Sequence, residues 1–203
     1  MPRDVYTDHL EQLKELRQAY GTNAADYVWS RVFDETQKAQ ETGGKLIIGE
    51  QAVLDRILPI VKKYGAAVVG LTLDANGIPQ TAEGRVAIAR RILDAALALG
   101  IPREDVLIDC LTLTVSAQQE QAAETLKAVS AVRRELGLQT VLGVSNISFG
   151  LPNRTLLTQS FLTQAMYAGL TLPIINPNQK EMMDAVSAFR VLSGEDQECR
   201  AYI

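Results

Sequence analysis

Two polar residues, Ser145 and Asn146, follow directly after the apolar run 140–144. The β-branched and apolar side chains of this run predict a buried strand, and an apolar-periodic helix is predicted over 153–168. Ligands of α/β proteins bind beyond the carboxyl ends of strands, and an amide side chain can both donate and accept hydrogen bonds. Asn146 is therefore a candidate contact for a heterocyclic ligand. The structural alternative remains open: Asn146 caps the turn and Ser148 satisfies the loop backbone.

Three more polar side chains occupy similar places. Asp109 follows an apolar pair, Asn176 ends the last apolar run, and Arg154 lies in the loop beyond Asn146. A carboxylate at a strand end can accept two parallel hydrogen bonds from a guanidine-like edge. The alternatives are a helix cap or a loop ion pair for Asp109, a plain turn for Asn176 and an exposed salt bridge for Arg154. Cys110 is interpreted as a small buried residue, because no basic partner that would lower its pKa is evident.

The elements that position these residues alternate along the chain. Strands are predicted over 45–48, 66–73, 106–115, 139–144 and 172–176, and helices over 50–64, 81–99, 117–136, 153–168 and 179–193. Gly169 is expected to cap the helix over 153–168, and Arg85 to be a solvated helix residue. Asp74 to Gly77 is interpreted first as a turn. This alternation predicts a parallel sheet with right-handed crossovers.

Four segments carry a resemblance to a known family. The sequence Gly-Val-Ser-Asn-Ile-Ser at 143–148, with its loop and arginine, resembles the pterin-binding domain of the methyltetrahydrofolate:corrinoid methyltransferases, which include the folate domain of cobalamin-dependent methionine synthase. Segments 70–79, 107–111 and 174–177 agree in order and spacing. The resemblance covers roughly residues 46–203. It implies α/β architecture, with parallel βα units like the second half of a pterin-binding TIM barrel.

The first 44 residues depart from that family. Residues 1–44 are predicted to be a helical N-terminal segment, with helices over about 4–20 and 23–41, and 45–203 to be the pterin-binding βα domain. Strands one to three of the family's barrel are not recognisable. An open arc of strands exposes side chains that a closed barrel would cover. The N-terminal helices or a second copy of the chain could cover them, and a homo-oligomer is expected.

The resemblance assigns a chemistry to the polar residues. It implies that Asp109 anchors the pterin ring of 5-methyltetrahydrofolate or tetrahydrofolate, and that Asn146 is the catalytic residue. An amide can serve either protonation state of the leaving pterin nitrogen by rotating. Ser148, Asn176 and Arg154 are further substrate-binding candidates. The methyl acceptor or donor, by resemblance, is the cobalt of a corrinoid (cobalamin) on a partner protein or domain, with transfer in either direction.

Two other functions stay open. A non-catalytic pterin-binding or assembly module is the alternative, because part of the barrel is unmatched. A dihydropteroate synthase is a third possibility, but the strand-end loops show neither a pyrophosphate site nor a lysine-based substrate loop. Measurements of folate binding and of cobalt methylation would distinguish these functions.

Composition narrows the class of protein. The 203 residues are 47% hydrophobic and 22% charged, as in an ordinary globular domain. A net charge of -4 gives no reason to expect a nucleic-acid partner, and no apolar run predicts a membrane span or signal segment. The two cysteines are too few for a disulfide framework. The single histidine, His9, argues against a histidine-ligated metal and against a Ser-His-Asp triad. Cytoplasm is the expected location.

Overall fold

The computed structural model describes residues 51–203, so the predicted strand over 45–48 and the predicted helices over 4–20 and 23–41 lie outside the described residues. The described strands are β1 (Val68–Leu71), β2 (Val106–Asp109), β3 (Gln139–Gly143) and β4 (Leu172–Ile174). The α-helices are α3 (Gln51–Tyr64), α4 (Ala82–Ala98), α5 (Gln121–Ala131), α6 (Arg154–Ala168) and α7 (Lys180–Leu192). Shorter turns are η1 (Arg103–Asp105), the π-helical η2 (Val132–Leu136), η3 (Val144–Ser148) and η4 (Gln197–Cys199).

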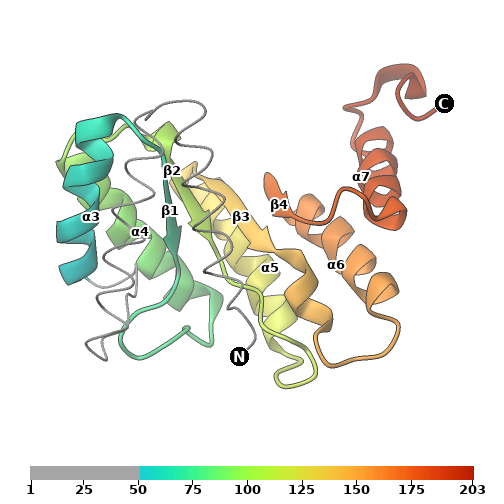
Figure 1. The fold of residues 1–203 in the computed structure, drawn as a ribbon, viewed down its shortest axis with the longest axis horizontal. Helices are drawn as coiled ribbons and strands as arrows, with labels where there is room; N and C mark the ends of the chain where they lie inside the picture. The colour runs from blue at the N-terminus through green and yellow to red at the C-terminus, as the bar shows by residue number, and fades with distance from the viewer. Residues whose placement is uncertain (1–50) are drawn as a thin grey trace, which may run out of the picture.

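The four described strands form one parallel sheet in the order β1-β2-β3-β4 (Figure 1). Leu71 is in register with Asp109, and Asp109 is in register with Val141. Gly143 is in register with Ile174. The predicted α/β architecture is therefore confirmed. Because all four strands run the same way, their carboxyl ends meet at one edge of the sheet, which is where ligands bind in such folds.

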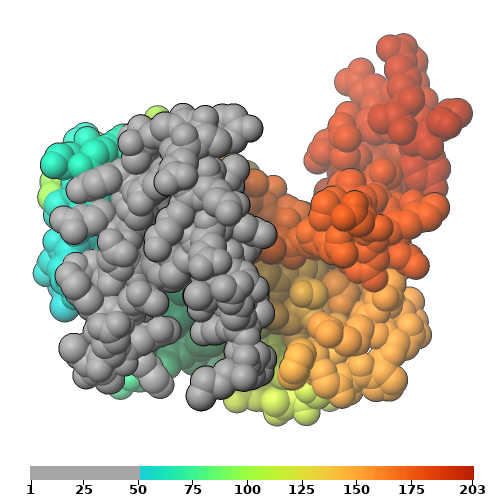
Figure 2. Space-filling model, viewed as in Figure 1, coloured from blue at the N-terminus to red at the C-terminus, as the bar shows by residue number. Residues whose placement is uncertain are grey.

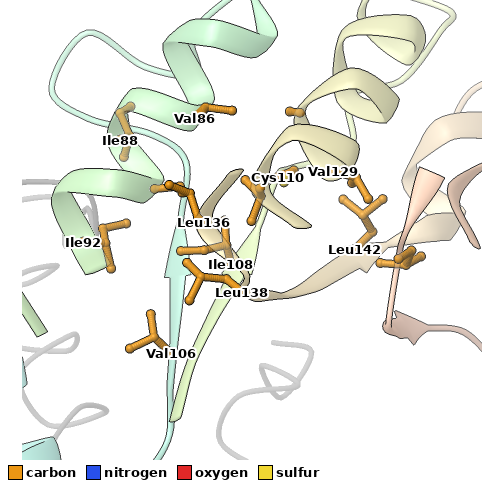
Figure 3. Close-up of a cluster of buried hydrophobic side chains, with 14 of the residues drawn as sticks. Val86, Ile88, Ile92, Val106, Ile108, Cys110, Val129, Leu136, Leu138 and Leu142 are labelled. Atoms are coloured by element: carbon orange, nitrogen blue, oxygen red, sulfur yellow. The ribbon is translucent and has the colours of Figure 1, made fainter. Parts of the chain in front are cut away.

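The residues of β2 divide between two faces of the sheet. Val106 and Ile108 are fully buried, and Figure 3 shows them in one apolar cluster with Ile92 of α4 and with Cys110. Asp109 is only partly buried. Because side chains alternate along a strand, Asp109 projects from the face opposite that cluster. The apolar side chains hold β2 on its helices, while its last residue faces away from them.

The strand predicted over 106–115 ends at Asp109, six residues early. The Leu111 N–H donates to Asp109 Oδ1 over 2.8 Å, and Leu111 has a positive φ of 60°. An aspartate that accepts the N–H two residues ahead turns the backbone out of the ladder, so the prediction beyond Asp109 is wrong. A positive φ in a residue other than glycine is strained and must be held by its surroundings.

Most of the other predicted elements are confirmed with small shifts in their ends. The predicted helix over 117–136 begins later, at Gln121, and its last turn is π-helical. Gly169 ends α6 with a φ of 111°, as predicted for its cap. The predicted turn at Asp74 is also present, because Asp74 and Gly77 exchange backbone hydrogen bonds of 3.1 and 2.8 Å.

The last helix stands at the β4 side of the sheet. Figure 2 shows α7 and the C-terminal turns projecting from the rest of the visible surface. α7 packs against α6, and its buried contacts come from Met182 and Ala185. No helix within residues 51–203 has both the length and the apolarity needed to cross a bilayer.

Candidate functional site

The polar residues predicted for the site gather at the carboxyl edge of three neighbouring strands. Asp109 ends β2, Asn146 lies in η3 directly after β3, and Asn176 lies two residues beyond β4. The loops after β2 and β3 are joined, since Val115 N donates to Ile147 O over 3.0 Å. The strand order and this contact bring the segments carrying Asp109 and Asn146 to the same edge.

Asp109 carries a partly buried carboxylate with one free oxygen. Its Oδ1 accepts the Leu111 N–H, and its main-chain oxygen accepts from Thr72 N and Thr72 Oγ1 over 3.1 and 3.2 Å. Within residues 51–203 no residue donates a hydrogen bond to Oδ2 and no basic group forms an ion pair with it. Burial raises the pKa of this carboxyl above its usual value, and the Leu111 N–H offsets part of that rise. The carboxylate is held firmly and has no ion-pair partner among residues 51–203.

The Asn146 side chain lies against Gly143. A Cβ added at residue 143 would lie 3.1 Å from Asn146 Nδ2, so the glycine leaves room for the amide. Asn146 is exposed, and its side chain makes no hydrogen bond within the described residues. Its main-chain oxygen accepts from Phe149 N over 3.2 Å. The turn is therefore closed by the backbone, which leaves the amide of Asn146 available to a ligand.

Ser148 and Arg154 lie in a network that braces η3. Ser148 is fully buried, and its Oγ lies 2.8 Å from Thr158 Oγ1 and donates to Ser145 O over 3.2 Å. Arg154 donates from Nε to Ser148 Oγ over 3.1 Å and from Nη2 to Ser145 O over 2.9 Å. These bonds fix the residues on either side of Asn146. The contact with substrate suggested for Ser148 and Arg154 stays a prediction.

Asn176 forms a turn at the start of α7. Its Oδ1 accepts from Asn178 N over 3.0 Å, and its main-chain oxygen accepts from Gln179 N over 3.1 Å. The turn interpretation of Asn176 is thus observed. The side chain is exposed, and its Nδ2 remains able to donate to a ligand at the strand end.

Arg85 was missed by reasoning from the sequence. The expectation of a solvated side chain is wrong, because Arg85 is 0% exposed. A signal was present: Arg85 falls on the same helical stripe as the fully buried Ala89, Ile92 and Ala96. A charged residue on such a stripe must find hydrogen-bond partners inside the protein.

Thr112 is another buried polar residue near the end of β2. It is 8% exposed, and its Oγ1 has no hydrogen-bond partner in the described part of the chain. It follows Asp109 by three residues. A buried hydroxyl without a partner is uncommon and is typical of a position that a ligand or water completes.

Cys110 is buried behind Asp109, as the sequence suggested. Burial raises the pKa of its thiol to about 12, and the negative charge of Asp109 adds to the rise. At neutral pH the thiolate needed for nucleophilic attack is therefore scarce.

We expect the native protein to show one reactive thiol. Cys110 is 0% exposed, whereas Cys199 is partly exposed. Native protein treated with a thiol reagent at pH 7 should be labelled at Cys199 alone, and both cysteines should react in denaturant. Peptide mass mapping would identify the labelled residue. Rapid labelling of Cys110 in folded protein would contradict its burial.

Residues 51–203 contain no candidate metal site, because no three His, Cys, Asp or Glu side chains are grouped so that they could hold an ion.

The sequence is similar to that of several known proteins. The model of the family described as pterin binding enzyme matches residues 27–176, a range that contains every candidate site residue named above. Methionine synthase from Mycobacterium leprae (strain TN) is 34% identical over 157 residues, covering 69% of this chain and 13% of that protein. Methylcorrinoid:tetrahydrofolate methyltransferase from Eubacterium limosum is 29% identical over 159 residues, covering 77% of this chain and 59% of that protein. Methionine synthase from Mycobacterium tuberculosis (strain ATCC 25618 / H37Rv) is 36% identical over 139 residues, covering 64% of this chain and 12% of that protein.

The chain belongs to the family of pterin binding enzymes. Within that family, the relatives confirm the resemblance to the methyltetrahydrofolate:corrinoid methyltransferases. The chain spans less than two thirds of the length of each of these relatives. The family match begins at residue 27, before the boundary placed at residue 45. The division into 1–44 and 45–203 stays a prediction.

Proposed function

We propose that the carboxyl edge of the sheet binds the pterin ring of 5-methyltetrahydrofolate, and that the chain transfers the methyl group between this folate and the corrinoid of a partner. The observation that carries the proposal is the carboxylate of Asp109. It is partly desolvated, held by Leu111 N, and has an oxygen without a partner in residues 51–203.

A pterin ring suits that carboxylate. One edge of the ring presents N–H donors side by side, in an arrangement like that of a guanidinium. A desolvated charge without a counter-charge is costly, and a ligand with donor groups recovers that cost on binding. Asp109 is rigid before the ligand arrives, because Thr72 and Leu111 both hold it. Little ordering of this residue would be needed on binding.

Asn146 supports the transfer step. The methyl group leaves a pterin nitrogen that is a poor leaving group unless it gains a proton or hydrogen bond. The Asn146 amide is unpaired within the described residues and borders the same edge as Asp109. A hydrogen bond that strengthens while charge develops on the nitrogen stabilises the transition state more than the bound substrate. The hydrogen bonds from Arg154 to Ser148 Oγ and Ser145 O hold the segment on either side of Asn146.

The proposed partner is a protein or domain that carries a corrinoid. The name of the relative from Eubacterium limosum pairs a methylcorrinoid with tetrahydrofolate. The corrinoid supplies the nucleophile for the methyl group, and the work of this chain is then to bind and orient the folate. Self-association and a cytoplasmic location stay predictions, the first of which the mass in solution would check.

A calorimetric titration with 5-methyltetrahydrofolate tests the binding half of the proposal. Saturable binding with one site per chain is expected, and the affinity should fall as acid protonates Asp109. Absence of heat and of ligand protection against thermal unfolding would refute folate binding. A non-catalytic pterin-binding module, the second candidate, would show the same binding without methyl transfer.

Asp109→Asn should make the ligand-free protein more resistant to heat at pH 7. The carboxyl pKa is raised in the folded state, so its contribution to stability is present below the unfolded pKa and is lost as pH rises through the folded pKa. Asparagine keeps the acceptor for Leu111 N and removes the desolvated charge. Calorimetric Tm values of the two proteins should differ at pH 7 and converge below about pH 3, where Asp109 is protonated in both the folded and the unfolded state. A lower Tm for the variant at pH 7 would contradict the raised pKa.

A further inference from the structure

The guanidinium of Arg85 occupies a buried polar cluster directly behind the candidate site. It makes five hydrogen-bond contacts, to Pro79 O, Cys110 O, Leu111 O, Thr125 Oγ1 and Gln121 Oε1, over 3.1, 3.0, 3.1, 2.7 and 2.6 Å. The two N–H groups of Nη1 are shared among Cys110 O, Leu111 O and Thr125 Oγ1. All of these acceptors are neutral. Burial lowers the pKa of this group from its usual value. The charge of Glu124 offsets part of this cost without forming an ion pair. A fully buried charge with no ion-pair partner in residues 51–203 is expensive, so a benefit elsewhere is expected to offset the rest.

Two of the acceptors belong to the turn that carries Asp109. The carbonyls of Cys110 and Leu111 are those of the two residues that follow it, and both accept from Nη1. The same turn contains the strained Leu111 and its hydrogen bond to Asp109 Oδ1. The guanidinium therefore holds the strained side of the turn while Thr72 holds the Asp109 carbonyl. The conformation of the turn is therefore fixed by Arg85 on one side and by Thr72 on the other.

The rest of the cluster makes the guanidinium itself rigid. Gln121 receives its bond from Arg85 while its own Nε2 donates to Gln80 O over 3.0 Å. Thr125 lies one helical turn from Gln121 on α5, and its hydroxyl oxygen is 3.2 Å from Leu111 O. Arg85 thus connects the start of α4 and the start of α5 to the end of β2. A guanidinium that is itself held rigidly can hold the carbonyls that it bonds in a fixed position.

We propose that Arg85 is the positioning residue of Asp109. It holds the carbonyls of Cys110 and Leu111 so that one Asp109 oxygen is occupied by Leu111 N and the other faces the ligand. This inference rests on the proposed function, because the ligand is taken to be the folate. Lysine cannot substitute, since its three donors radiate from one nitrogen and cannot span five acceptors on three segments.

The test compares Arg85→Lys with Arg90→Lys. Arg90 lies on the same helix, is 53% exposed at its side chain and, among the described residues, forms an ion pair with Glu135 at 3.8 Å. Arg85→Lys should weaken binding of 5-methyltetrahydrofolate roughly tenfold, while Arg90→Lys should bind like wild type. In an Asp109→Ala background the further loss caused by Arg85→Lys should disappear, because residues that act through one another are not additive. An undiminished loss in that background would overturn the proposal.

A readout without ligand separates this inference from the proposed function. The amide resonance of Leu111 should shift as Asp109 titrates, since its N–H is bonded to that carboxylate. Arg85→Lys should move this resonance and reduce its pH response, and Arg90→Lys should leave both unchanged. Thr125→Val, a near-isosteric change, should act in the same direction if Arg85→Lys does not fold. A wild-type Leu111 response in folded variants would refute the role of Arg85, whereas absence of folate binding in wild type would refute the proposed function alone.

Discussion

Asp109→Ala should bind 5-methyltetrahydrofolate roughly 30- to 700-fold more weakly than wild type, a loss of about 2–4 kcal/mol. The variant leaves the donor edge of a buried pterin without its charged acceptor. It also leaves the Leu111 N–H without the Asp109 oxygen. Removing one partner of a desolvated pair costs more than the net value of the bond, because the remaining group stays unsatisfied. Calorimetry on the folded variant measures this loss directly.

Asp94→Ala is the matched control. Asp94 is exposed on α4, so the same change in charge and size is made away from the carboxyl edge. Its affinity should equal that of wild type. Asp109→Ala with unchanged affinity would show that Asp109 is not the anchor. Equal losses in both variants would assign the effect to net charge.

Asn146→Ala should slow methyl transfer by on the order of a hundredfold while changing folate affinity far less. The amide borders the strand end, lies over Gly143 and is not used to close its own turn. Its hydrogen bond to the leaving nitrogen would strengthen as the bond to the methyl group breaks. Removal of such a bond appears in the rate at saturating folate and much less in binding.

The control for this variant is Asn178→Ala. Asn178 is an exposed asparagine at the same edge, and it contributes its backbone N–H to the Asn176 turn, which alanine preserves. The transfer rate should remain close to that of wild type. If Asn146→Ala keeps the wild-type rate at saturating folate, Asn146 has only a structural part in η3.

The fold was predictable where local patterns were strong. The apolar run of β3, the helical periodicity of α6 and the glycine that ends α6 all specify structure through neighbouring residues. β2 was predicted too long because its apolar and β-branched pattern continues beyond Asp109. The strand ends there because Asp109 bonds the Leu111 N–H locally and because a buried arginine from α4 holds the same turn through tertiary contacts. Such an end cannot be read from periodicity.

The position of the candidate site could be predicted from the sequence. The roles of its individual residues could be predicted less well. Asp109 and Asn146 were identified because residue type and strand end coincide. Ser148 and Arg154 were suggested by the family resemblance and by their place in the following loop, and their hydrogen bonds brace η3. Arg85 was overlooked because its partners come from distant segments, although its place on a buried stripe indicated them. Whether a polar side chain meets a ligand or the protein depends on tertiary contacts that spacing alone does not contain.

The function proposed for this chain is to bind methyltetrahydrofolate and to transfer its methyl group. The direct measurement mixes the chain, 5-methyltetrahydrofolate and reduced cobalamin, free or on a corrinoid protein, without oxygen and follows the cobalt(I) absorbance. The expected result is a loss of absorbance that needs both chain and folate and that slows with Asn146→Ala. Persistent cobalt(I) absorbance with wild-type chain saturated by folate would contradict the transfer and leave a pterin-binding module.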